Sequence, residues 1–229
     1  LSTSIFERLS RKLMGTDAFV TLQYQYRMNS TICEFSSNTF YGGIVKPGMI
    51  NGISVGDQSL SEFFRKFNIG NIDYDNKNSS GFFFNPKLPF IFINTEQLNL
   101  YDSTANPSEK NTNKNDSIYN LGEAKIVVSI LRYFLHKICE AHRSREELIE
   151  IISKIGVISG FRAQNQEIKK MLIQELTKNN TEILRRLVDT QTLLENLIID
   201  TVDRFQGQER EIIIFSCVDS NPRADLSKN

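Results

Sequence analysis

Four short apolar runs alternate with stretches of helical periodicity, and this alternation limits the possible folds more than any other feature of the sequence. The runs are Leu88–Asn94, Ile155–Ser159, Asn196–Val202 and Glu211–Cys217. A continuous apolar run of this length is typical of a strand that is buried on both faces. Between the runs, Leu121–Cys139 shows the clearest helical period. Strands that alternate with helices favour a parallel sheet, so the sequence predicts an α/β fold.

Weaker patterns complete this prediction. Ala18–Gln25 is rich in β-forming residues and predicts another strand. Asn29 or Ser30 can cap a following helix, which ends at Gly42–Gly43. The side chains predicted to share one face of this helix are Ile32, Phe35, Ser36 and Thr39. Further helices are predicted over Leu60–Phe67, Ala163–Leu176 and Glu182–Glu195, with an irregular insertion over 46–87 and a flexible loop over 96–119.

Composition excludes several classes of protein. The 229 residues carry 27 Lys and Arg against 27 Asp and Glu, and 40% are hydrophobic. These values are ordinary for a globular domain and exclude collagen, bulk disorder and a disulfide scaffold, while the neutral balance allows nucleic-acid binding only through a local patch. The separated cysteines Cys33, Cys139 and Cys217 favour reduced thiols in an intracellular compartment. No membrane-spanning run occurs, and because the chain opens on Leu1 without a Met we expect a piece of a longer protein.

Polar sequences follow three of the predicted strands, at the edge of a parallel sheet where ligands usually bind. The first of them is Gln25–Asn29. The guanidinium of Arg27 offers fixed donors that can hold a phosphate, and the ring of Tyr26 can lie against a base. The alternative for Arg27 is an ordinary surface arginine in a salt bridge.

The second polar sequence, Thr201–Glu209, lies between two apolar runs. Gly207 permits a backbone conformation, or the close approach of a ligand, that a Cβ would block. Hydroxyl, carboxylate and amide groups are presented by Thr201, Asp203, Gln206 and Glu209. A sugar hydroxyl, a metal-bound water and a phosphodiester oxygen all remain open as partners of these groups.

The third polar sequence, Ser159–Gly160, lies where a predicted strand turns into a helix. The free N–H groups of a helix N-terminus can hold a phosphate. A simple N-cap by Ser159 explains the same residues equally well.

One group of candidate metal ligands is set aside. His136, Cys139 and His142 are three residues apart. Steps of three drift around a helix axis and no fourth ligand is nearby in the sequence, so no metal site is predicted.

Five segments resemble, in order, the landmarks of one known family. The segments are Leu1–Leu9, Gln25–Tyr41, Asn120–Ala124, Ile155–Ile158 and Thr201–Ser216. The family is that of the superfamily 1 (SF1B) helicases of the senataxin and up-frameshift type. Gln25–Met28 is similar to its motif IV and Thr201–Glu209 to its motif V, and the matches span nearly the whole chain.

The resemblance implies a fold and an activity. The fold is a RecA-like parallel sheet with helices on both faces, the second of two motor domains, over residues 18–229 after an inter-domain connection over 1–17. The activity is that of an ATP-dependent helicase that translocates on single-stranded RNA or DNA, with ATP and Mg²⁺ bound jointly with the first RecA-like domain. The alternative is a catalytically inactive RecA-like module that binds nucleic acid or a protein.

Residue roles on the nucleotide side follow from the same resemblance. Arg27 would be the catalytic arginine finger on the γ-phosphate. Tyr26 would lie against the adenine, and Gln25 would belong to the same ATP-binding set. Gly207 and Glu209 would face the ribose and phosphate side.

Roles on the nucleic-acid side are implied in the same way. Thr201 and Ser159 would contact the backbone of the single strand. Asp203 and Gln206 would couple that contact to the ATP site.

The departures from the family pattern are equally specific. The sequence has no G-x-x-x-x-G-K-[ST] loop, no Asp-Glu magnesium pair and no motif VI. Ser159–Phe161 stands where the family usually has Thr-Pro-Tyr. We therefore expect this chain alone not to hydrolyse ATP.

Overall fold

The structure is a computed structural model that describes residues 3–70, 85–94, 117–141, 144–178 and 190–218. The backbone contacts divide the chain into two compact units, Leu1–Gln58 and Ser59–Asn229. This division falls at Gln58, whereas the assignment of residues 1–17 to an inter-domain connection stays a prediction. No helix in the described ranges is both long and apolar enough to cross a membrane.

A three-stranded parallel sheet forms the centre of the second unit within the described residues. Its strands are β5 (Ile155–Ser159), β6 (Ile198–Thr201) and β7 (Ile212–Ser216), in the order β6-β5-β7. All three were predicted as apolar strands, and their parallel pairing confirms the predicted α/β fold.

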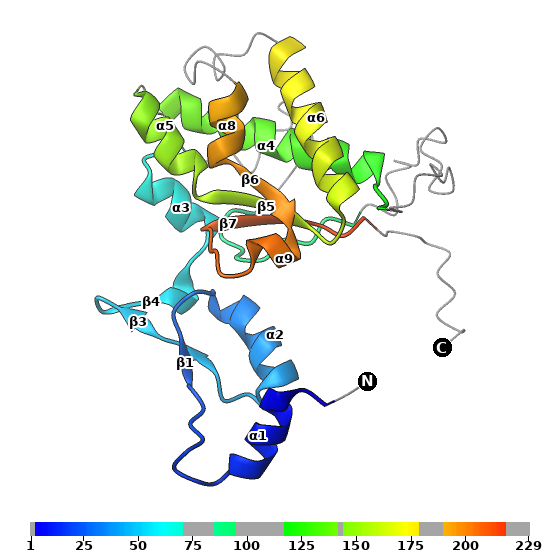
Figure 1. The fold of residues 1–229 in the computed structure, drawn as a ribbon. Helices are drawn as coiled ribbons and strands as arrows, with labels where there is room; N and C mark the ends of the chain where they lie inside the picture. The colour runs from blue at the N-terminus through cyan, green and yellow to red at the C-terminus, as the bar shows by residue number, and fades with distance from the viewer. Residues whose placement is uncertain (1–2, 71–84, 95–116, 142–143, 179–189, 219–229) are drawn as a thin grey trace. The chain divides into compact units, whose positions relative to one another are not determined.

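Helices lie on both faces of this sheet. The described helices of the second unit are α3 (Leu60–Lys66), α4 (Leu121–Ala141), α5 (Arg145–Ile152), α6 (Arg162–Lys178), α8 (Thr190–Asn196) and α9 (Val202–Phe205). In Figure 1, α4, α6 and α8 lie on one side of the sheet, and the short α9 lies on the other. The helices predicted near residues 60, 121 and 163 are confirmed. Of the one predicted over Glu182–Glu195, residues 190–195 are helical and the rest lie outside the described residues.

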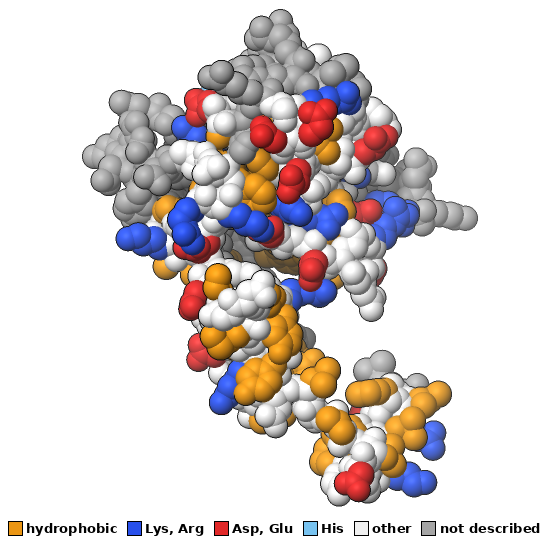
Figure 2. All heavy atoms as spheres, turned by 90° about the vertical axis from the view of Figure 1, so that its left-hand side faces the viewer, with side chains coloured by type: hydrophobic (Ala, Val, Ile, Leu, Met, Phe, Trp, Pro, Cys, Tyr) orange, Lys and Arg blue, Asp and Glu red, His pale blue; other side chains and the backbone are white. Residues whose placement is uncertain are grey.

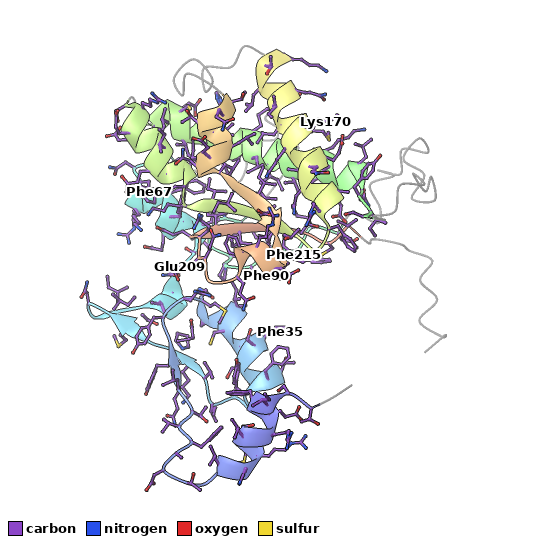
Figure 3. All side chains as sticks on the ribbon, viewed as in Figure 1. Phe35, Phe67, Phe90, Lys170, Glu209 and Phe215 are labelled. Atoms are coloured by element: carbon purple, nitrogen blue, oxygen red, sulfur yellow. The ribbon has the colours of Figure 1, made fainter. Side chains whose placement is uncertain are left out.

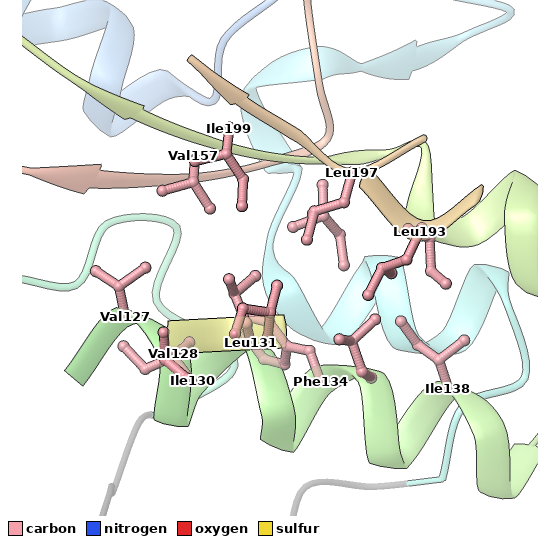
Figure 4. Close-up of a cluster of buried hydrophobic side chains, with 14 of the residues drawn as sticks. Val127, Val128, Ile130, Leu131, Phe134, Ile138, Val157, Leu193, Leu197 and Ile199 are labelled. Carbon is pink, nitrogen blue, oxygen red and sulfur yellow. The ribbon is translucent and has the colours of Figure 1, made fainter. Parts of the chain in front are cut away.

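The core of the second unit forms between α4 and the sheet. Leu131 of α4 and Val157 of β5 are fully buried, and Ile199 of β6 is 2% exposed. Figure 4 shows these side chains facing one another across the layer. Because strand side chains alternate between faces, Gly156 falls on the opposite face, towards α9.

The first unit contains two helices and four very short strands in its described part. They are α1 (Ile5–Leu13), β1 (Tyr24–Gln25), α2 (Ser30–Phe40), β2 (Lys46–Pro47), β3 (Met49–Ile50) and β4 (Ile53–Ser54), and the 3₁₀ turn Val55–Asp57 follows. Strand β1 runs parallel to β2, and β3 runs antiparallel to β4. Asn29 caps α2 as predicted, since its Oδ1 accepts the Thr31 N–H at 2.8 Å. Hydrophobic side chains are frequent on the surface of this unit (Figure 2).

The structure shortens one predicted element of the first unit and adds the environment of another. The strand predicted over Ala18–Gln25 comprises only Tyr24–Gln25. The helix over Ser30–Phe40 confirms the spacing predicted for Ile32, Phe35, Ser36 and Thr39. The face that they share is largely exposed, and Phe35 is 70% exposed (Figure 3). Instead Cys33 and Ser37 are buried, and the Ser37 hydroxyl accepts the Val45 N–H at 3.1 Å. The buried side of α2 therefore includes a polar contact to the returning chain, which periodicity does not report.

The prediction of a strand over Leu88–Asn94 is wrong. The segment has no strand pairing, and Phe90 and Phe92 are 61% and 75% exposed. An apolar run becomes a buried strand only where a neighbouring strand accepts its backbone hydrogen bonds, and no described strand does so here. The predicted loop over 96–119 lies outside the described residues except for 117–119.

Candidate functional site

The first polar turn follows β1 and is closed by the side chain of Gln25. Its Oε1 accepts the N–H groups of Arg27 and Met28 at 2.8 and 2.7 Å, and its Nε2 donates to the Met28 carbonyl at 2.7 Å. The Gln25 amide is thus bonded to the backbone of its own turn. Arg27 is exposed, and Tyr26 is 57% exposed with its ring against Gly48.

The carboxyl ends of the three strands in the second unit place three hydroxyl residues side by side. Ser159 of β5 pairs in register with Thr201 of β6 and with Ser216 of β7. Residues that pair across parallel strands project from the same face of the sheet. The edge of the sheet where ligands were expected therefore carries a row of hydroxyl groups.

The two predicted nucleic-acid contacts in this row differ in environment. Ser159 is fully buried, and its hydroxyl accepts the Phe161 N–H at 3.2 Å. This is the local hydrogen bond typical of a turn-forming serine. Thr201 is half-buried and is the N-cap residue of α9, yet its side chain makes no capping hydrogen bond. Both assigned contacts stay predictions.

The turn after α9 is exposed and depends on one glycine. Asp203, Gln206 and Glu209 are all exposed, and Glu209 is labelled in Figure 3. Gly207 adopts a φ of +83°, and nothing lies within 4 Å of where its Cβ would be. Of the two reasons for this glycine given by the sequence, the backbone conformation is the one observed.

Replacing Gly207 by alanine is expected to lower the free energy of unfolding by about 1–2 kcal/mol, because an alanine pays for the left-handed conformation. Chemical denaturation followed by circular dichroism measures this change. Gly160→Ala is the matched control, since Gly160 has an ordinary φ and open space around its Cβ position. Equal stability of the two variants would contradict the explanation.

Gly156 lets this turn pack on the sheet. A Cβ there would lie 3.1 Å from Ile213 Cδ1, 3.2 Å from Arg210 Cγ and 3.3 Å from Phe205 Cε2. These distances are tighter than most real Cβ contacts, so the chain around Phe205 rests directly on the backbone of β5. In the sequence Gly156 is only one residue of the Ile155–Ile158 landmark, and its role in packing is visible only in the structure.

A buried polar network holds the end of β7 against α4. The Oε2 atom of Glu123 accepts the Ser216 hydroxyl at 2.7 Å and the Val218 N–H at 2.8 Å. Gln164 Nε2 donates to Ser216 Oγ at 3.0 Å, and Asn120 Nδ2 donates to the Val218 carbonyl at 3.2 Å. Asn120 also caps α4, because its Oδ1 accepts the Glu123 N–H at 3.0 Å. The network thus gives the Asn-x-x-Glu landmark a physical meaning.

Two residues beside this network, Val218 and Cys217, have an unusual backbone conformation and a shifted pKa, respectively. Val218 has a φ of +70°, which a β-branched side chain strongly disfavours, and two partners from the network hold it there. Burial, and secondarily the Glu123 carboxylate, raise the pKa of the Cys217 thiol. Reasoning from the sequence gave no role to Ser216 or Gln164. Ser216 stood out only as the end of the Thr201–Ser216 segment, and nothing distinguished Gln164 from the polar residues beside it.

The predicted residues fall into two sets. Six of them lie along the carboxyl end of the second unit's sheet and the turn that follows β6: Ser159, Thr201, Asp203, Gln206, Gly207 and Glu209. The other three, Gln25, Tyr26 and Arg27, form the turn in the first unit. Across the described parts of both units, no three His, Cys, Asp or Glu side chains are grouped so as to hold a metal ion.

Comparison with known proteins identifies the family. A family described as "AAA domain" matches residues 1–227. The chain is 27% identical over 236 residues to the "DNA replication ATP-dependent helicase/nuclease DNA2" of Bos taurus, covering 100% of this chain and 18% of that protein. It is 27% identical over 210 residues to "Helicase SEN1" of Saccharomyces cerevisiae, covering 91% and 7%.

A third relative is the "Regulator of nonsense transcripts 1" of Caenorhabditis elegans, 28% identical over 221 residues, with 96% of this chain and 16% of that protein covered. The chain spans less than a fifth of the length of each of these three relatives. The matching family nevertheless covers nearly the whole chain. The chain therefore belongs to the AAA domain family, as an α/β RecA-like domain of the superfamily 1 helicases of the senataxin and up-frameshift type.

Proposed function

We propose that this chain is the second motor domain of an ATP-dependent helicase that moves along single-stranded RNA or DNA. The observation that carries the proposal is the family match over residues 1–227. The two polar turns that resemble motifs IV and V each follow a strand, β1 and β6. ATP and Mg²⁺ would bind jointly with the first RecA-like domain, which would supply the phosphate loop and the magnesium ligands.

Arg27 is the group proposed to act on the reacting phosphate. Its guanidinium would stabilise the charge that develops on the γ-phosphate during hydrolysis. Tyr26 would stack against the adenine with its exposed ring. Gln25 would contribute by shaping the turn, because its amide is bonded to the backbone of Arg27 and Met28. An arginine finger needs a fixed backbone of this kind, because catalysis of phosphoryl transfer depends on the position of the guanidinium.

The turn after β6 is proposed to face both ligands. Glu209 and Gly207 would lie on the ribose and phosphate side of the nucleotide. The Thr201 hydroxyl, which makes no capping hydrogen bond, would donate a hydrogen bond to the backbone of the nucleic-acid strand. The case for Thr201 is stronger than the case for Ser159, because Ser159 is fully buried. Asp203 and Gln206, which are exposed on the same short turn, would link the two contacts.

The test is ATP hydrolysis by the protein that contains both motor domains, with single-stranded RNA, single-stranded DNA or no strand. Strand-stimulated turnover is the expected result, and the better activator identifies the substrate. A folded protein that binds a strand without turnover would overturn the enzyme and favour the inactive binding module. The chain of 229 residues assayed alone should be inactive.

A further inference from the structure

The ring of Tyr26 occupies the space that any side chain at position 48 would need. A Cβ built on Gly48 would lie 2.2 Å from Tyr26 Cε1 and 2.7 Å from both Cδ1 and Cζ. Real Cβ atoms do not approach other atoms so closely, so one of the two groups would have to move. Gly48 has no positive φ, and its need for a glycine therefore arises from this contact and not from its backbone conformation.

Gly48 itself is held in place. Its N–H donates to the Gln25 carbonyl at 2.7 Å, and its carbonyl accepts the Val55 N–H at 3.1 Å. The residue is buried, directly after the pairing of β1 with β2. A Cβ at position 48 could avoid the ring only if the backbone moved, and that movement would break these hydrogen bonds.

Of the two groups, the Tyr26 ring is the one that would move if position 48 carried a side chain. Tyr26 is 57% exposed, so a side chain at position 48 would turn the ring towards solvent, away from the support that Gly48 gives it in the wild type. The backbone of its turn stays closed by the Gln25 amide. An alanine at position 48 would therefore displace the ring while leaving the Arg27 backbone where it is.

We propose that Gly48 is a positioning residue that holds the Tyr26 ring against the backbone with its exposed part presented to the base of the nucleotide. This inference rests on the proposed function, in which Tyr26 stacks on the adenine. A rigid aromatic platform binds a base more tightly than a rotating one, since the ordering cost is already met. The effect falls on nucleotide affinity, because the arginine that acts on the phosphate is untouched.

The kinetic test uses the protein with both motor domains at saturating strand. Gly48→Ala is expected to raise the KM for ATP about tenfold and to leave kcat within about twofold, the size of a lost stacking contact. In a Tyr26→Ala background the same substitution should add nothing, because the clashing ring is gone. Gly70→Ala is the matched control, since Gly70 has an ordinary φ and nothing within 4 Å of its Cβ position.

The outcomes separate this inference from the function on which it rests. An unchanged KM in Gly48→Ala, or additive effects in the double variant, would overturn the positioning role while strand-stimulated hydrolysis still stood. No hydrolysis in the wild type would overturn both. Should Gly48→Ala fail to fold, nuclear Overhauser effects between the Gly48 α-protons and the Tyr26 ring in the wild-type chain decide the contact, and their absence refutes it.

Discussion

Strand-stimulated ATP hydrolysis is expected to fall by about 10³-fold or more when Arg27 is replaced by alanine in the protein with both motor domains. An arginine finger neutralises charge that appears only in the transition state, so its loss lowers kcat more than it weakens ATP binding. Arg27 is exposed on a turn whose backbone is bonded to Gln25, and the fold should survive the substitution. Steady-state kinetics with saturating strand measure the change.

Two variants bracket this prediction. Arg27→Lys keeps the charge but loses the planar fork of donors, and it should recover only a small part of the rate. Arg65→Ala is the matched control, because Arg65 is an exposed arginine that pairs with Glu62 on the surface of α3. A loss of less than about tenfold in Arg27→Ala would contradict the finger role. It would favour the alternative stated from the sequence, in which Arg27 is an ordinary surface arginine in a salt bridge.

The free energy of unfolding is expected to fall by about 3 kcal/mol when Glu123 is replaced by alanine. The substitution removes the acceptor of two hydrogen bonds, from the Ser216 hydroxyl and the Val218 N–H, and leaves both donors buried. It also releases the strained backbone of Val218 from one of its two partners. Chemical denaturation of the chain, followed by circular dichroism, measures the loss.

Glu140→Ala provides the comparison on the same helix. Glu140 is exposed at the last turn of α4, where it pairs with Lys137 at 2.9 Å. Exposed pairs of this kind contribute about 0.5 kcal/mol or less. Similar losses in the two variants would show that the buried network contributes no more than a surface ion pair.

Local patterns predicted the three described sheet strands of the second unit and three of its helices, but not α5. Strands β5, β6 and β7 and helices α3, α4 and α6 lie where apolar runs and helical periods indicated. Side-chain alternation and helical spacing are set by backbone geometry, so they can be recognised without knowledge of the neighbours. The cap at Asn29 is local for the same reason, since the side chain bonds to the chain two residues on.

The same patterns failed where a distant partner decides the outcome. Leu88–Asn94 is as apolar as a buried strand, but no described strand pairs with it. Helix α2 buries Cys33 and Ser37, and the hydrogen bond between Ser37 and Val45 could not be read from the spacing of its apolar residues. Whether a segment is buried and paired depends on how all the helices and strands pack together. An apolar run therefore indicates a tendency to form a strand, but not whether the segment is buried in a sheet.

Motif order along the chain was enough to predict the family and the candidate residues, because motifs are short and each keeps its own spacing. Strand register and packing determine which distant residues lie next to one another, and the order of motifs along the chain does not. Ser159, Thr201 and Ser216 lie side by side only because three parallel strands end together. Glu123 reaches Ser216 across 93 residues of sequence, and Tyr26 finds its support on Gly48. Contacts of this kind form when the chain closes on itself, and their geometry follows from the packing of whole helices and strands and not from any local run of residues.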